Sequence, residues 1–292
     1  MHNPYRIWLS EWLDLEARGA VLPLGGLAPP ARRALAADAP RVLLFSPHPD
    51  DECVVGGLAL RLMRGAGWEV VNVAVTRGSR VDRREARWRE LTDACRYLGF
   101  TLVSPGADGL DDVHPEARRS DPAAWKRKVD AIVEVLRAYP AGMVMMPHDA
   151  DWNRTHLGVH ALVQDALAQA GDFRGVVIET EFWGAMSSPN LMVEVGVADL
   201  ADLVAALSFH VGEVKRNPYH LRLPAWMQDN VRRGAELVGG QGGLAPACAF
   251  ATLYRANRWA EGRLCPLYGG GRLLKADEPV MNLLGGGDGW KS

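Results

Sequence analysis

From Arg41 onward the chain alternates short apolar runs with longer amphipathic segments. Short apolar runs rich in β-branched residues predict strands, and apolar residues spaced three and four apart predict helices. The predicted strands cover residues 42–45, 70–75, 101–103, 143–146, 176–180 and 191–196. The predicted helices cover residues 53–66, 83–98, 122–138, 155–170, 198–214 and 224–238. This order predicts an α/β fold, a Rossmann-like and mainly parallel sheet with helices on both faces.

Two further segments flank this core. Residues 1–40 form an N-terminal helical extension, in which apolar positions recur at helical spacing before a linker that contains Pro29 and Pro30. This helix packs against the domain or a partner subunit, or it lies on a membrane surface. Its polar face mixes acidic and basic residues, which favours packing. Residues 41–215 form the core, and residues 216–292, with a Gly-rich tail, form a C-terminal extension packed on the same domain.

Composition and charge narrow the class of function. The chain has 33 basic and 35 acidic residues and a formal net charge of −2, which excludes nucleic acid as the expected partner and favours a small polar substrate. We expect no membrane span, because no apolar run is long enough for one, and a cytoplasmic location, because the start lacks a secretory pattern. The four cysteines lack CxxC spacing. A homo-oligomer is compatible with this sequence.

The Gly-rich segments 239–243 and 269–271 lack the residue order of a phosphate-binding loop. We therefore interpret both as flexible turns.

Ionisable residues gather directly after the first predicted strand, at His48, Asp50, Asp51 and Glu52. In parallel sheets, ligands bind outside the carboxyl ends of the strands. Four such side chains in one turn at that edge indicate a site that holds a cation or moves protons.

A second cluster follows the predicted strand 143–146 and includes His148 and His156, with His160 one helical turn later. Two histidines and one carboxylate with an open fourth position form a catalytic zinc site, beside which a spare carboxylate takes a proton from water. His156 and His160 have the spacing of a zinc-protease helix, but Leu157 stands where that motif needs its glutamate. Spacing alone leaves open which histidine joins the first cluster.

The segment from Pro47 to Gly57 resembles the signature (A/S)-H-P-D-D-E-x-x-x-G-G of the LmbE/PIG-L N-acetylglucosaminyl deacetylases. Residues 148–156 look like the second motif of that family, D-x-N-x-D-H. Arg87-x-x-Glu90, with Ala94 and Leu98-Gly99, is similar to the family helix R-x-x-E-x-x-x-A-x-x-L-G. The resemblance covers roughly residues 41–215, which makes this segment the catalytic core of an LmbE-like protein.

The resemblance implies a zinc-dependent hydrolase that removes an N-acetyl group from an N-acetylglucosamine-type sugar or conjugate. His48, Asp51 and His156 then bind Zn²⁺, and Asp50 is the general base. Two alternatives stay open: a deacylase of another acylated amine, such as a lipid- or antibiotic-linked amino sugar, and a non-catalytic Rossmann-like sugar- or nucleotide-binding protein.

The same resemblance assigns supporting roles. Glu52 accepts hydrogen bonds near the following helix, and Gly56 and Gly57 let that helix approach the sheet closely. In relatives the oxyanion donor is often a histidine at the position that Asn153 occupies here. The candidates for an oxyanion donor are His148, Asn153 and His210. The candidates for contact with the sugar are Arg87, Asp108 and Trp152.

Overall fold

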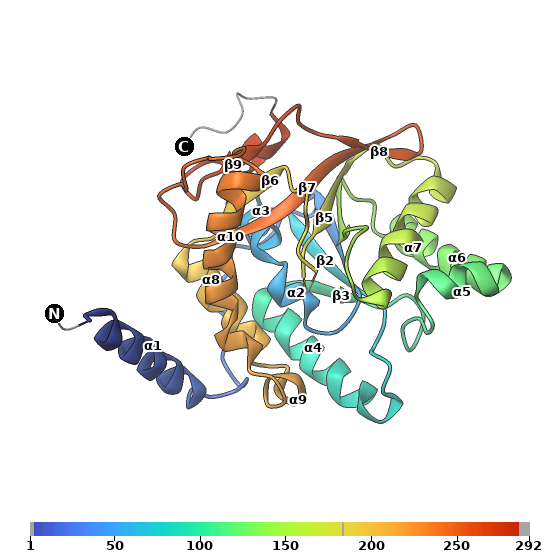
Figure 1. Cartoon of the computed structure of the whole chain (residues 1–292). Coiled ribbons are helices and arrows are strands. Elements are labelled where there is room, and N and C mark those ends of the chain that lie inside the picture. Colours follow the sequence, from blue (N-terminus) through green and yellow to red (C-terminus); the bar gives the residue numbers. More distant parts are fainter. Residues whose placement is uncertain (1–2, 183, 286–292) are drawn as a thin grey trace.

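The computed structural model describes residues 3–182 and 184–285. A nine-stranded sheet runs through its centre in the order β3-β2-β1-β4-β5-β7-β6-β9, with β8 paired to β7 (Figure 1). The strands are β1 Arg41–Ser46, β2 Glu69–Ala74, β3 Thr101–Val103, β4 Met143–Pro147, β5 Val176–Thr180, β6 Leu191–Glu194, β7 Ala251–Ala260, β8 Arg263–Pro266 and β9 Arg272–Leu274. β1 to β5 are mutually parallel, so the predicted fold class is confirmed.

Helices cover both faces of this sheet. They are α1 Tyr5–Ala20, α2 Asp51–Val54, α3 Gly57–Ala66, α4 Arg84–Leu98, α5 Pro115–Ser120, α6 Pro122–Ala138, α7 Arg154–Ala170, α8 Val197–Leu207, α9 Val211–Val214 and α10 Leu223–Leu237. Short 3-10 helices cover Val81–Arg83 (η1), Tyr219–Leu221 (η2) and Val280–Leu284 (η3). Helices α3, α4 and α8 contribute to one apolar core, while α6 and α7 contribute to a second core. Successive strand residues alternate between these two cores, as a sheet buried on both sides requires.

The strand order reverses direction between β1 and β4. Chain connections from β1 lead outward to β2 and β3 on one side, and β4 and β5 lie on the other. β1 and β4 are direct neighbours, with Val42 opposite Met143. At such a switch point the carboxyl ends of two adjacent strands leave a crevice in which ligands bind. The two predicted clusters follow these two strands.

β7 is a central strand of the sheet that was not predicted from the sequence. β7 runs antiparallel between β5 and β6. It lies in the C-terminal segment that was described above as an extension with a Gly-rich tail. Its apolar pattern is interrupted by Arg255 and Asn257, both of which bond the buried carboxylate of Glu179, at 2.6 and 2.8 Å. The chain beyond residue 216 therefore contributes to the main sheet.

Two predicted helices are each broken in two. The segment predicted at 53–66 forms α2 and α3, and the segment predicted at 198–214 forms α8 and α9. The first break follows Val54, at the end of the short helix that carries Asp51 and Glu52, and the second places His210 immediately before α9. Both breaks therefore lie beside the site.

Helix α1 extends away from the body of the molecule (Figure 1). It contains no buried residue and meets the domain through a Glu16–Arg222 ion pair of 2.7 Å and through Gly19, which lies against Leu221. The domain therefore leaves the apolar side of α1 uncovered, and packing against a partner subunit stays a prediction. Among the helices of the described part of the chain, none has the length and apolar character needed to span a membrane.

Candidate active site

The turn after β1 has a left-handed residue at its centre. Asp50 is buried and has a φ of 111°, a region that non-glycine residues seldom adopt. The backbone N–H of Asp50 donates to Glu52 Oε2 (2.9 Å), and that of His48 donates to Asp51 Oδ2 (2.7 Å). The acidic side chains of the motif thus stabilise the turn that presents them.

Three residues bring metal-binding atoms together. One donor atom each from His48, Asp51 and His156 lies within 4.8 Å of the other two. Asp51 Oδ2 lies 3.7 Å from His48 Nδ1 and 3.6 Å from His156 Nε2. Asp51 Oδ1 and His156 Nε2 are buried without a hydrogen-bond partner among the described residues, a costly state that a cation relieves. Two imidazoles and one carboxylate therefore fit a divalent cation with an open position.

Asp151 supports the histidine of this cluster. Its Oδ2 lies 3.1 Å from His156 Nδ1, the ring nitrogen opposite the cluster, and its Oδ1 accepts the N–H of Asn153 (2.7 Å). Burial raises the pKa of Asp151, but His156 and the Asn153 N–H outweigh it and lower that pKa. A carboxylate in this place fixes the orientation and tautomer of a metal-binding histidine. This role of Asp151 was not predicted from the sequence, although the residue stands inside the second motif.

Asp50 lies beside the cluster without belonging to it. Its Oδ2 accepts the hydroxyl of Tyr219 (2.5 Å) and lies 3.7 Å from Arg87 Nη2. Burial and the neighbouring charge of Asp51 raise the pKa of Asp50 to about 7. Burial opposes ionisation of Asp51 too, but His156 and His48 outweigh it and lower its pKa. The pKa values of these two adjacent carboxylates are thus shifted in opposite directions.

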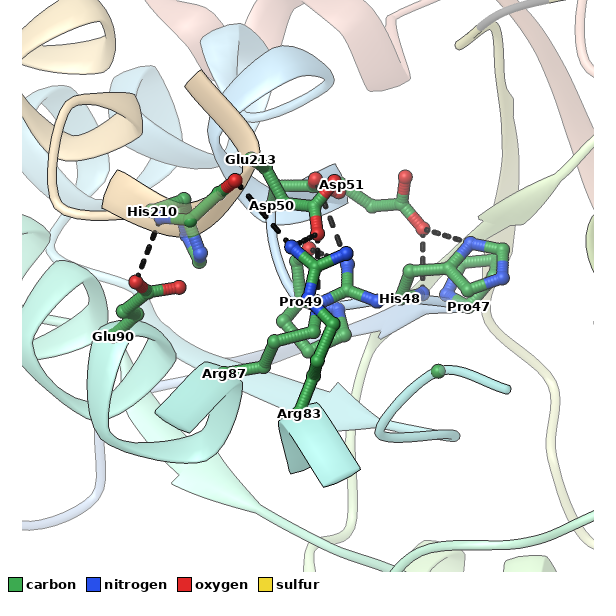
Figure 2. A network of polar contacts seen from close by, with 12 residues as sticks. Pro47, His48, Pro49, Asp50, Asp51, Arg83, Arg87, Glu90, His210 and Glu213 are labelled. Carbon is green, nitrogen blue, oxygen red and sulfur yellow. Dashed lines mark hydrogen bonds and ion pairs between the residues drawn. The ribbon is translucent and has the colours of Figure 1, made fainter. Parts of the chain in front are cut away.

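A cavity of about 220 Å³ opens over these groups. The residues that line it are His48, Asp50, Gly78, Ser79, Arg87, Phe182, Glu213, Arg216, Asn217 and Tyr219. Figure 2 shows Arg83 and Arg87 extending toward the turn, with Glu213 opposite them. Arg87 donates to the carbonyl of Pro49 (2.9 Å), and Glu213 pairs with Arg83 (2.7 Å) and with Arg216. The wall is polar and bears both signs of charge.

Comparison with known proteins identifies the segment that carries both clusters. The family model described as "PIG-L: GlcNAc-PI de-N-acetylase" matches residues 43–167. The resemblance seen in the motifs is thereby confirmed, and all three metal-binding candidates lie inside the matched range.

Solved structures share the fold of this chain. The A40926 pseudoaglycone deacetylase Dbv21 has a TM-score of 0.56 at 15% identity, covering 76% of this chain and 99% of its own. The N,N'-diacetylchitobiose deacetylase of Pyrococcus horikoshii has a TM-score of 0.54 at 15% identity, covering 75% and 84%. GalB of Pseudomonas putida, a 4-carboxy-2-hydroxymuconate hydratase, has a TM-score of 0.55 at 17% identity, covering 74% and 95%. The comparison with curated proteins gave no match. Because a hydratase shares the fold, the activity must be argued from the site.

The fold places the three oxyanion candidates in different settings. His148 uses both ring nitrogens, because Nε2 bonds the carbonyl of Gly184 (2.8 Å) and Nδ1 accepts the N–H of Ala150 (3.2 Å). Asn153 caps α7 by accepting the N–H of Thr155 (2.9 Å). His148 therefore has no ring N–H left for an oxyanion.

His210 is fully buried and directs Nε2 at Glu52 Oε1, at 2.8 Å. It is absent from the cavity lining, and so is Asn153. The oxyanion roles of these residues stay predictions.

Among the predicted sugar contacts, Arg87 lines the cavity, and Asp108 and Trp152 do not. Asp108 is exposed and pairs with Arg77 (3.0 Å), and Trp152 is 69% exposed. Their contact with substrate stays a prediction. Tyr219 is a site residue that the sequence did not indicate, since it is 169 positions from Asp50 and belongs to no motif.

Proposed function

We propose that this protein is a metal-dependent hydrolase that removes the N-acetyl group of an N-acetylglucosamine-type sugar or conjugate. The observation that carries the proposal is the buried carboxylate of Asp50, which stands outside the ligand cluster and lines the cavity directly beside it. A protein that only bound a sugar would have no use for a second carboxylate there, because burying one is costly. The PIG-L family match and the deacetylase neighbours support the same conclusion.

Each residue then has a defined task. His48, Asp51 and His156 hold the cation, and this donor set suits Zn²⁺. A bound cation of this kind makes water more acidic and polarises a carbonyl. Asp50 accepts the proton of the attacking water and donates it to the departing amine. Tyr219 and Arg87 hold the Asp50 carboxylate in place.

The cavity favours a small substrate group. Its volume of about 220 Å³ is below the usual range of ligand sites, about 300–1,000 Å³, so it suits a single sugar ring with a short acyl group. Ser79, Arg216 and Asn217 provide polar groups for ring hydroxyls. A longer acyl chain, the main alternative within the hydrolases, needs more apolar space than this cavity offers.

The test is a substrate panel with matched variants. N-acetylglucosamine, N,N'-diacetylchitobiose, N-acetylglucosaminyl-inositol, N-acetylglucosaminyl-malate and an acylated glycopeptide are each assayed for acid release, with and without a chelator. We expect chelator-sensitive acetate release from at least one. If none of these substrates released an acid, the proposal would be rejected. Release only of acids longer than acetate would favour the alternative, a deacylase of another acylated amine.

We predict that Asp50→Asn keeps the metal and lowers kcat by about 10²–10⁴-fold, the usual contribution of a general base. Asp51→Ala loses both metal and activity, because it removes a ligand. Asp229→Asn, on an exposed face of α10, is the matched control and changes neither. Elemental analysis with steady-state kinetics separates these outcomes. Equal metal loss in the two site variants would refute the division of roles.

A further inference from the structure

A second group of ionisable side chains lies behind the turn, at Glu52, Cys53 and His210. All three are buried with 0% exposure, and one donor atom of each lies within 4.8 Å of the others. They belong to distant parts of the chain, since Glu52 and Cys53 are in α2 while His210 precedes α9. Their proximity has two explanations, a second cation site or a network of hydrogen bonds.

The hydrogen bonds favour the network. Glu52 Oε1 accepts from His210 Nε2 (2.8 Å) and Cys53 Sγ (3.1 Å), and Glu52 Oε2 accepts from the N–H of Asp50 (2.9 Å). Both carboxylate oxygens therefore already face hydrogen donors. A cation would have to displace those donors in a place without solvent access, which is unfavourable.

This network ends on a strained residue. Asp50 has a φ of 111°, and a left-handed conformation in a non-glycine residue costs on the order of 1–3 kcal/mol and persists where its surroundings enforce it. The bond from the Asp50 N–H to Glu52 acts directly on that backbone unit. His210 in turn bonds Glu52 Oε1 and so fixes the position of this buried carboxyl group.

The segment that carries His210 is itself anchored. The N–H of Gly212 donates to Glu90 Oε1 (2.9 Å), and Arg83 donates to the carbonyl of Gly212 (3.3 Å). On the other side, Gly56 brings α2 against Leu203 of α8, the helix that leads to His210. The network therefore connects the turn after β1 to α4 and α8.

We propose that His210 and Glu52 are positioning residues that hold the backbone of Asp50 in its left-handed conformation, and that His210 acts through Glu52 and does not contact the substrate. The kinetic consequence of this role rests on the proposed hydrolase function. Its structural consequence, the fixed Asp50 amide, is independent of any substrate.

The first test compares two conservative variants of His210. A glutamine amide reaches as far as the Nε2 position and can still donate to Glu52, whereas an asparagine amide reaches only as far as Nδ1. In protein labelled with ¹⁵N-aspartate, we expect the Asp50 amide to exchange about 10-fold faster in His210→Asn, the equivalent of one lost hydrogen bond. Exchange in His210→Gln stays within about twofold of the parent protein. Equal protection in both variants would overturn the proposal.

The second test uses kinetics and a double-mutant cycle. We expect His210→Asn to lower kcat about 10–100-fold with KM unchanged and one metal per chain retained, the size of effect seen for supporting residues. His210→Gln recovers most of the loss. Adding Glu52→Gln to His210→Asn lowers kcat little further, because coupled residues are not additive. An oxyanion donor would instead give losses that multiply.

His114→Asn is the control, since His114 caps α5 and asparagine is a good cap. Two metals per chain, both lost in His210→Asn, would show that the cluster is a cation site and would reject the network. An inactive parent protein with the expected exchange pattern would reject the proposed function alone. An active parent protein in which the Asp50 amide exchanges no faster after His210→Asn would reject the positioning role alone.

Discussion

His156 and His160 lie one turn apart on α7, but their environments differ. His156 faces Asp51, whereas His160 Nδ1 bonds the carbonyl of Pro147 (2.9 Å) and its other nitrogen contacts Gln164. The second histidine is thus committed to hydrogen bonds within the domain, although it has the spacing of a ligand pair.

We predict that His156→Ala lowers metal affinity by more than about 100-fold, because it removes a ligand, which costs more than losing a supporting partner. His160→Ala keeps the metal. Calorimetric titration of Zn²⁺ into each apo-protein measures both affinities. Retention of tight binding in His156→Ala would mean that another residue completes the cluster.

What the sequence reveals about these residues depends on separation along the chain. His48, Asp50 and Asp51 lie within four positions of the sequence, directly after a predicted strand. The first cluster can therefore be predicted without a structure. Tyr219 reaches Asp50 across 169 positions. It lies in η2, which packs against α8 and α10. Local patterns carry no information on such contacts.

At the scale of elements, the two glycines between α2 and α3 determine how closely the helices approach their neighbours. A Cβ on Gly56 would lie 2.4 Å from the backbone oxygen of Glu52 and 3.1 Å from Leu203. A Cβ on Gly57 would lie 3.1 Å from Val195 and 3.2 Å from Thr252. The expected close approach to the sheet is therefore confirmed for Gly57, against β7, whereas Gly56 lies against α8.

We predict opposite effects for two glycine-to-alanine changes near this junction. Gly56→Ala destabilises the fold by about 1–3 kcal/mol, the usual cost of overpacking, because the rigid backbone of Glu52 cannot yield. Gly65→Ala stabilises by about 0.5–1 kcal/mol, because a helix interior favours alanine and its Cβ would meet only Val280, at an ordinary 3.7 Å. Urea unfolding of both variants gives the two values. Two changes of the same sign would contradict this account.

Elements with a clear apolar pattern were predictable, and β7 was not. The predicted strands at 101–103 and 176–180 match β3 and β5. β7 escaped prediction because Arg255 is stabilised by Glu179 from the adjacent strand. A buried ion pair between strands gives no periodic signal.

At the scale of the whole molecule, the candidate metal centre bridges two parts of the fold. His48 and Asp51 follow β1, whereas His156 is on α7 after β4, and these strands meet at the switch point of the sheet. His156 is more than a hundred positions from Asp51 along the sequence, so the three ligands come together only in the folded chain. A cation held by all three therefore binds the folded chain and not the unfolded one.

We therefore predict that metal stabilises the entire domain. At a free Zn²⁺ concentration 100 times the Kd, linkage gives about 2.7 kcal/mol of stabilisation. At about 2–4 °C per kcal/mol for a domain of this size, Tm rises by roughly 5–10 °C. Differential scanning calorimetry with and without a chelator measures the shift. Asp51→Ala abolishes it, while Asp50→Asn preserves it because Asp50 is not a ligand. A shift of equal size in Asp51→Ala would place the stabilising cation elsewhere in the chain and would separate fold stabilisation from the proposed chemistry.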